Sequence, residues 1–182
     1  QYTYAICADI EKMYRQVQIS PEHRIFQKIF WREHPSLPLE VYQLHTVTYG
    51  MTSSPFLAVR CLFELGNLCE SENPQVANII KNHFYVDDLL TGANSTDEAI
   101  ELCKQISNIL HSGCFHLRKW ASNSPCIIKH VTNEDPNSDI HQIASNDHTK
   151  TLGLTWNYKS DEFLYSTRLK IDHSRKVTKR NI

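Results

Sequence analysis

Residues 83–93 have the sequence HFYVDDLLTGA, in which two short apolar runs flank a pair of aspartates. This pattern predicts a tight β-hairpin with Asp87 and Asp88 at its tip. Aspartates are common in turns, so an ordinary Asx turn is one interpretation of the pair. However, the Asn-Gly or Asp-Gly pair that usually closes a tight hairpin is absent, and Asp9 ends another apolar run at residues 3–9. A cluster of carboxylates is therefore the alternative interpretation.

The elements on either side of the hairpin predict the fold class. Its central part has the order strand, helix, strand-turn-strand, helix, strand, which is the ferredoxin-like split βαβ order. We therefore expect an α+β fold, with an antiparallel sheet that carries helices on one face. The further strands are expected at residues 16–19, 25–32, 40–48, 115–120, 151–156 and 162–169, and a polar loop or insertion is expected at residues 132–150.

Local signals mark the helices between these strands. Ser54 followed by Pro55 predicts an N-cap and a first helical turn, and a second helical stretch is expected after Pro74. Ser95 and Glu98 form a capping box for the next helix, which is expected to end at Gly113. The apolar residues of the first helix that are expected in the core are Phe56, Leu62 and Phe63.

Composition places the chain among folded proteins of about one domain. Its 182 residues are 41% hydrophobic and 21% charged, with no apolar run long enough for a membrane helix and no signal peptide pattern. The six cysteines form no C-x-x-C pair, so we expect free, buried thiols of an intracellular protein rather than disulfides or a zinc site.

The charge is distributed unevenly along the chain. The net charge is only −1, which does not indicate a nucleic-acid binder. However, residues 168–182 contain six basic residues and one acid, and the rest of the chain is acidic. This basic end can contact phosphate, although a solvated terminal segment explains it equally well.

The strand order also predicts where the aspartates lie. The first strand and the hairpin are neighbours in the ferredoxin-like order, so Asp9 is expected near Asp87 and Asp88. Such a cluster repels itself unless a cation neutralises it, and carboxylate oxygens suit Mg²⁺ first. Carboxylates that bridge two metal ions are the set required for in-line phosphoryl or nucleotidyl transfer.

Several segments, taken in order, resemble the motifs of one family. CADIEKMY at residues 7–14, YGMTSSPF at 49–56, YVDD at 85–88 and FHLRKWASN at 115–123 resemble the palm of a reverse transcriptase, most closely that of Bel/Pao-type LTR retrotransposons. The resemblance implies a polymerase palm at residues 1–131 with a partial fingers excursion at 16–48. Residues 151–182 would form a primer-grip-like hairpin, marked by LGLTW at 152–156, and a basic C-terminal end.

The resemblance implies the catalytic and metal-binding residues. Asp9, Asp87 and Asp88 match the acids that hold two Mg²⁺ ions, with Mn²⁺ as an alternative. The backbone carbonyl of Ile10 is implied as a further metal ligand. Lys119 matches the catalytic lysine that helps to protonate the leaving pyrophosphate.

The resemblance also implies contacts with the nucleotide. Tyr14 matches the aromatic residue under the incoming sugar, which excludes a 2′-hydroxyl group. Tyr49, Gly50 and Tyr85 match residues that contact the template and the dNTP. Gly50 is expected at a backbone position with positive φ or close approach.

The implied function is RNA-directed DNA polymerase activity on dNTPs and a primed RNA or DNA template, with no membrane involved. The parent Pol polyprotein would supply the fingers, thumb, RNase H and integrase, in the cytoplasm within virus-like particles. We expect residues 1–182 alone to be weak or inactive. A non-catalytic retroelement remnant is one alternative. Another metal-dependent phosphotransfer enzyme on the same core, such as a nucleotide cyclase or nuclease, is a second.

Overall fold

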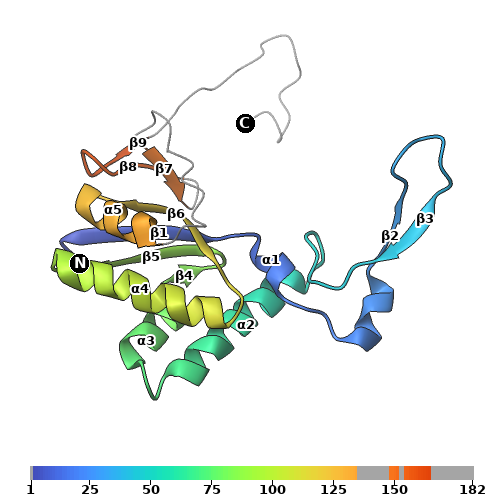
Figure 1. Ribbon diagram of the computed structural model, residues 1–182, viewed down its shortest axis with the longest axis horizontal. Helices are drawn as coiled ribbons and strands as arrows, with labels where there is room; N and C mark the ends of the chain where they lie inside the picture. Colours follow the sequence, from blue (N-terminus) through green and yellow to red (C-terminus); the bar gives the residue numbers. More distant parts are fainter. Residues whose placement is uncertain (1, 135–147, 152–153, 165–182) are drawn as a thin grey trace, which may run out of the picture.

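The computed structural model describes residues 2–134, 148–151 and 154–164. A four-stranded sheet forms its centre, as Figure 1 illustrates. Every neighbouring pair in this sheet is antiparallel, in the order β4-β5-β1-β6. The observed fold confirms the predicted α+β class. The strands are β1 (Tyr4–Ile10), β4 (Phe84–Tyr85), β5 (Asp88–Ala93) and β6 (Leu117–Ser122).

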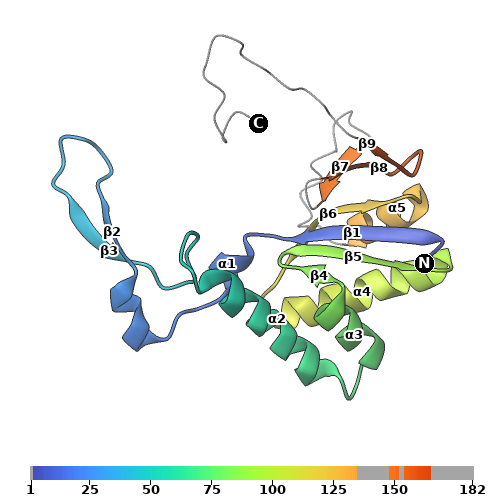
Figure 2. The same ribbon diagram turned by 180° about the vertical axis from the view of Figure 1, so that it is seen from behind.

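Helices cover one face of this sheet (Figures 1 and 2). Alternate residues of β1, namely Ile6, Ala8 and Ile10, are buried in the core that the helices share. Cys7 and Asp9 therefore point to the opposite face. The helices are α2 (Ser54–Cys69), α3 (Pro74–Asn82), α4 (Thr96–Ser112) and α5 (Pro125–Glu134).

A small second sheet lies against the other face of the central sheet. Trp156 packs on Cys7 and Ala121 there. A pair of strands was predicted in this region, and the structure has three. They are β7 (His148–Thr151), β8 (Leu154–Asn157) and β9 (Glu162–Leu164).

Two predictions fall largely outside the described residues. Most of the polar loop predicted at 132–150 is one of them, although its two ends belong to α5 and β7. The basic residues of 168–182 are the other.

The excursion after β1 is less regular than predicted, and its hairpin projects away from the central sheet (Figure 1). The strand predicted at 16–19 is wrong, because Gln16 is the last residue of a short helix and Gln18 forms only an isolated bridge with Thr46. The strand predicted at 25–32 is shortened because Pro21 starts a 3₁₀ turn that continues to Phe26. The elements are α1 (Met13–Gln16), η1 (Pro21–Phe26), β2 (Lys28–Trp31) and β3 (Glu40–Gln43).

The start of α2 differs from the prediction. Ser53 rather than Ser54 occupies the N-cap position, and its side chain makes no capping hydrogen bond. Ser54 is buried instead, and its hydroxyl donates to the carbonyl oxygen of Thr48. Phe56 is 69% exposed, which corrects its assignment to the core, because the buried face of the helix runs through Ala58 and Leu62.

The other helix signals are confirmed with one adjustment. The Ser95 hydroxyl accepts a hydrogen bond from the Glu98 amide at 3.2 Å, and α4 ends at Gly113. The Glu98 carboxylate accepts from the amide of Asn94 rather than from that of Ser95. Helix α5 was not predicted.

The cysteines are free, as expected, but they are not all buried. Cys7 and Cys103 are buried, whereas Cys61, Cys114 and Cys126 are exposed. Among the described residues, no helix is both long and apolar enough to cross a membrane.

Candidate active site

The three aspartates meet at one edge of the central sheet. Asp9 is the last residue but one of β1, and it lies directly opposite Asp88 at the start of β5. Side chains that face each other in an antiparallel pair have Cβ atoms about 5 Å apart, on the same face. Asp87 is held in the β4–β5 turn, where its carbonyl oxygen accepts a hydrogen bond from the Ile10 amide at 2.8 Å. The structure therefore brings together the three acids that the sequence singled out.

The carboxylates at this edge influence one another. Burial is the main cause that raises the pKa of Asp9 above its usual value, and the charges of Asp87 and Glu11 raise it further. The hydrogen bond and charge of Lys119 act in the opposite direction but do not cancel these effects. Burial of Asp9 is therefore the leading reason for the direction of this pKa shift.

A β-bulge in β6 supplies the cations of this edge. Cys7 pairs with Ala121 but Asp9 pairs with Arg118, so β6 has one extra residue here. Lys119 has a φ of 54°, which lies in the left-handed region. As a result, Arg118 and Lys119 both reach the carboxylate face, although neighbours in a regular strand point to opposite faces.

Two ion pairs follow from the bulge. Lys119 Nζ is 3.2 Å from Asp9 Oδ2, and Arg118 Nε is 3.1 Å from Glu11 Oε2. The hydrogen bond from Arg118 is the main cause that holds the pKa of Glu11 below its usual value. Glu11 lies two residues after Asp9, so it extends the acidic face beyond the three predicted acids.

An aromatic pair follows the end of β1. Tyr14 in α1 and Tyr49 in the loop before α2 have ring centroids 4.7 Å apart, with an angle of 37° between the ring planes. Gly50 has a φ of 87°, which confirms the predicted positive φ. Tyr85, on β4, lies opposite Asp88 and is 65% exposed.

A family model described as reverse transcriptase (RNA-dependent DNA polymerase) matches residues 1–119. The chain belongs to the reverse transcriptase family. A comparison with curated proteins gave no match. The matched residues include the aspartates, the tyrosine pair and Lys119 of this reverse transcriptase. The family thus confirms the resemblance at its general level, and the Bel/Pao assignment stays a prediction.

Members of the reverse transcriptase family use divalent metal ions, and the donor chemistry of this edge fits such ions. Carboxylate oxygens from Asp9, Asp87 and Asp88 are hard ligands of the kind Mg²⁺ takes. Within the described parts of the chain, however, no three His, Cys, Asp or Glu side chains are already arranged to hold a metal ion. A cation does lie on Asp9, and it is the ammonium group of Lys119. The metal role predicted for the Ile10 carbonyl stays a prediction.

Glu11 and Arg118 lie at the edge as well, although neither was predicted as a site residue. Glu11 could have been found, because residues i and i+2 of a strand share a face. The pairing of Arg118 with Glu11 could not have been predicted, because it depends on the bulge.

Asn123 has a structural role, since its side chain forms hydrogen bonds with the amide of Ala5 and the carbonyl of Thr3 at the start of β1.

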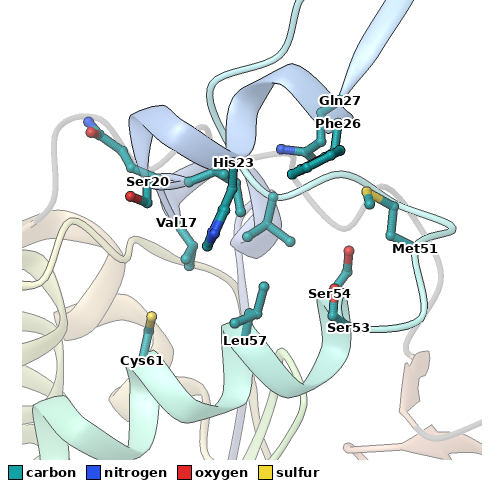
Figure 3. Close-up of a pocket in the computed structure, with 13 residues that line it drawn as sticks. Val17, Ser20, His23, Phe26, Gln27, Met51, Ser53, Ser54, Leu57 and Cys61 are labelled. Atoms are coloured by element: carbon teal, nitrogen blue, oxygen red, sulfur yellow. The ribbon is translucent and has the colours of Figure 1, made fainter.

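A separate cavity of about 400 Å³ lies between the η1 segment and the start of α2 (Figure 3). Its lining is mainly apolar, with Val17, Phe26, Met51 and Leu57 among the residues around it. None of the predicted catalytic or nucleotide-binding residues lines it. The carboxylate edge, not this cavity, is therefore the candidate active site.

Proposed function

We propose that this chain is the palm of an RNA-directed DNA polymerase from a Bel/Pao-type retrotransposon, which transfers a nucleotide from a dNTP to a primer 3′-hydroxyl. Membership of the reverse transcriptase family supports the polymerase activity in general. The observation that carries the proposed nucleotide transfer is the convergence of Asp9, Asp87 and Asp88 at one sheet edge.

The three aspartates would form the metal site. Asp9, Asp87 and Asp88 would hold two divalent ions. When bound, these ions supply charge neutralisation for the phosphates and a lowered pKa for the attacking hydroxyl. The backbone bond between Ile10 and Asp87 fixes the turn that carries two of the acids.

The nucleotide would lie on the aromatic pair beside these acids. Tyr14 would present its ring to the sugar, where a 2′-hydroxyl would collide with it. Tyr49 contacts the ring of Tyr14, and this contact would help to hold that ring in place. A nucleotide cyclase or nuclease on the same core has no need of such a sugar gate, which disfavours that alternative.

The partners follow from the same proposal. The palm would act with fingers, thumb, RNase H and integrase segments of a longer Pol polyprotein, on a primed RNA or DNA template. Its place would be the cytoplasm, within virus-like particles. Residues 1–182 without those segments would incorporate little dNTP, since one subdomain gives a duplex little to bind.

The test is removal of one acid at a time in the longer polymerase. We expect Asp9→Asn and Asp87→Asn each to lower dNTP incorporation on poly(rA)/oligo(dT) by at least about a hundredfold, because each loses a charge that the transition state needs. Primer–template binding should change less than about twofold, since neither acid contacts the duplex through its charge. Asp97→Asn, on the exposed first turn of α4, is the matched control and should keep normal turnover. Near-normal turnover in either active-site variant would refute the metal assignment, and a parent protein without any activity would favour a non-catalytic remnant.

A further inference from the structure

Lys119 holds the position that a metal ion would need on Asp9. Its ammonium nitrogen lies 3.2 Å from Asp9 Oδ2, and the proposed function assigns this carboxylate to a divalent ion. One oxygen cannot keep this close contact with the ammonium and also bind a metal at full strength, because the two cations repel each other.

The surroundings of Asp9 make Lys119 its specific counter-ion. Asp9 lies opposite Asp88, and the charges of Asp87 and Glu11 also act on it, whereas Lys119 is the cation in direct contact with it. The two neighbouring cations, Arg118 and Lys12, are both engaged with Glu11, at 3.1 and 3.5 Å. In the described part of the chain, the ion pair of Asp9 is the one with Lys119.

The two cations of the bulge differ in how easily they can leave. The Lys119 side chain is 73% exposed, whereas that of Arg118 is 23% exposed. An exposed ammonium on a flexible stem can move into water at little cost, because exposed ion pairs contribute little to stability. The Lys119 pair is therefore the exchangeable one.

We propose that Lys119 is a built-in counter-ion of Asp9 that competes with divalent cations and is displaced when they bind. This inference rests on the proposed function, because it takes Asp9 as a metal ligand. A displaced Lys119 would have its ammonium available at the site, which the catalytic role predicted for it requires. Pairing and release of one lysine would then be coupled to metal loading.

The first test measures Mn²⁺ binding to residues 1–182 by isothermal titration and by the loss of the free-ion EPR signal. Lys119→Gln should tighten binding about two- to fivefold, which is the factor expected from losing an exposed ion pair. Lys119→Arg should leave the affinity unchanged, because it keeps the charge. Lys12→Gln removes one charge close by without breaking the Asp9 pair, and should change the affinity less than about 1.5-fold in 0.15 M salt.

The second test follows Lys119 itself. Saturating Mg²⁺ should raise the acetylation rate of Lys119, because the displaced amine is no longer held by Asp9; mass spectrometry after brief treatment with an amine-reactive ester measures this rate. Lys129, which is exposed on α5, is the internal control and should not respond.

The outcomes separate this inference from the proposed function. The competition would be overturned if wild type and Lys119→Gln bound Mn²⁺ with equal affinity, or if Lys119→Gln and Lys12→Gln changed that affinity equally. Either result would leave Mn²⁺ binding through Asp9 intact. Binding that Asp9→Asn leaves unchanged would overturn the metal site and the competition together.

Discussion

Replacing Ser54 by alanine should loosen the loop that carries Tyr49. The Ser54 side chain is 2% exposed, and its hydroxyl donates to the carbonyl oxygen of Thr48, six residues earlier. Tyr49 and Gly50 lie within the loop that this bond closes. The Ser54→Ala variant therefore removes a buried contact that fixes the support of Tyr14.

The size of the effect follows from the burial of the two partners. A buried acceptor that loses its hydrogen-bond partner costs about 1–3 kcal/mol. Thr48 is only partly buried, so water can replace some of the lost bond, and alanine favours the helix slightly over serine. We expect a loss of about 1–2 kcal/mol in the free energy of unfolding, or roughly 3–6 °C in Tm for a chain of this size.

Ser53→Ala is the matched control for this prediction. Ser53 is the neighbouring residue, is exposed, and makes no capping hydrogen bond. Its replacement should change the free energy of unfolding by less than about 0.5 kcal/mol. Urea denaturation followed by circular dichroism measures both variants. Equal stabilities for the two variants, or a larger loss for Ser53→Ala, would refute the assignment of the loop closure to Ser54.

Two further predictions concern the sugar gate and the thiols. In the proposed polyprotein, Tyr14→Val should raise the use of rNTPs relative to dNTPs by at least about tenfold. This factor corresponds to a lost steric exclusion of about 1.4 kcal/mol or more. Single-nucleotide incorporation measures the discrimination, and an unchanged value would contradict the role of Tyr14 as a sugar gate. Burial raises the pKa of Cys7 to about 11 and that of Cys103 to about 12, so at pH 8 both should alkylate at least about a hundred times more slowly than exposed Cys114 and Cys126. Peptide mapping after timed iodoacetamide treatment measures these rates, and equal labelling would show that the two thiols are accessible.

The parts of the fold that the sequence predicted are those with strong local signals. The apolar run of β1, the hairpin around Asp87 and the capped helix α4 each combine a pattern with a boundary residue. Helix α5 was missed because its isoleucines, valine and threonine are typical of strands. Ser124 followed by Pro125 repeats the start signal of α2 and could have identified it.

The excursion shows the limit of local patterns. The β-rich sequence of residues 25–32 predicts one strand. However, Pro21 starts a 3₁₀ turn that includes Ile25 and Phe26. Phe56 shows a similar limit within α2. Its spacing fits a helix, but which face is buried depends on the packing of α3 and α4, which no local pattern contains.

The site was predictable where it depends on strand order alone. Asp9 and Asp88 became neighbours because antiparallel pairing of β1 with β5 follows from the order of the elements. The partner of Asp9 on β6 was not predictable. In a regular β6 strand, Arg118 and Lys119 would point to opposite faces of the sheet. The shift in register places both side chains on the face that carries the carboxylates.

The bulge therefore has a physical reason at this place in the sheet. In a regular β6, one of the two cations would point toward the face that the helices bury, where an unpaired charge is costly. With the extra residue, Leu117 and Trp120 are buried while Arg118 and Lys119 both meet carboxylates. The strained φ of Lys119 costs about 1–2 kcal/mol, which two cation–carboxylate contacts and the burial of Trp120 can offset. The same distortion places the more exposed cation, Lys119, on Asp9 and the more enclosed one, Arg118, on Glu11.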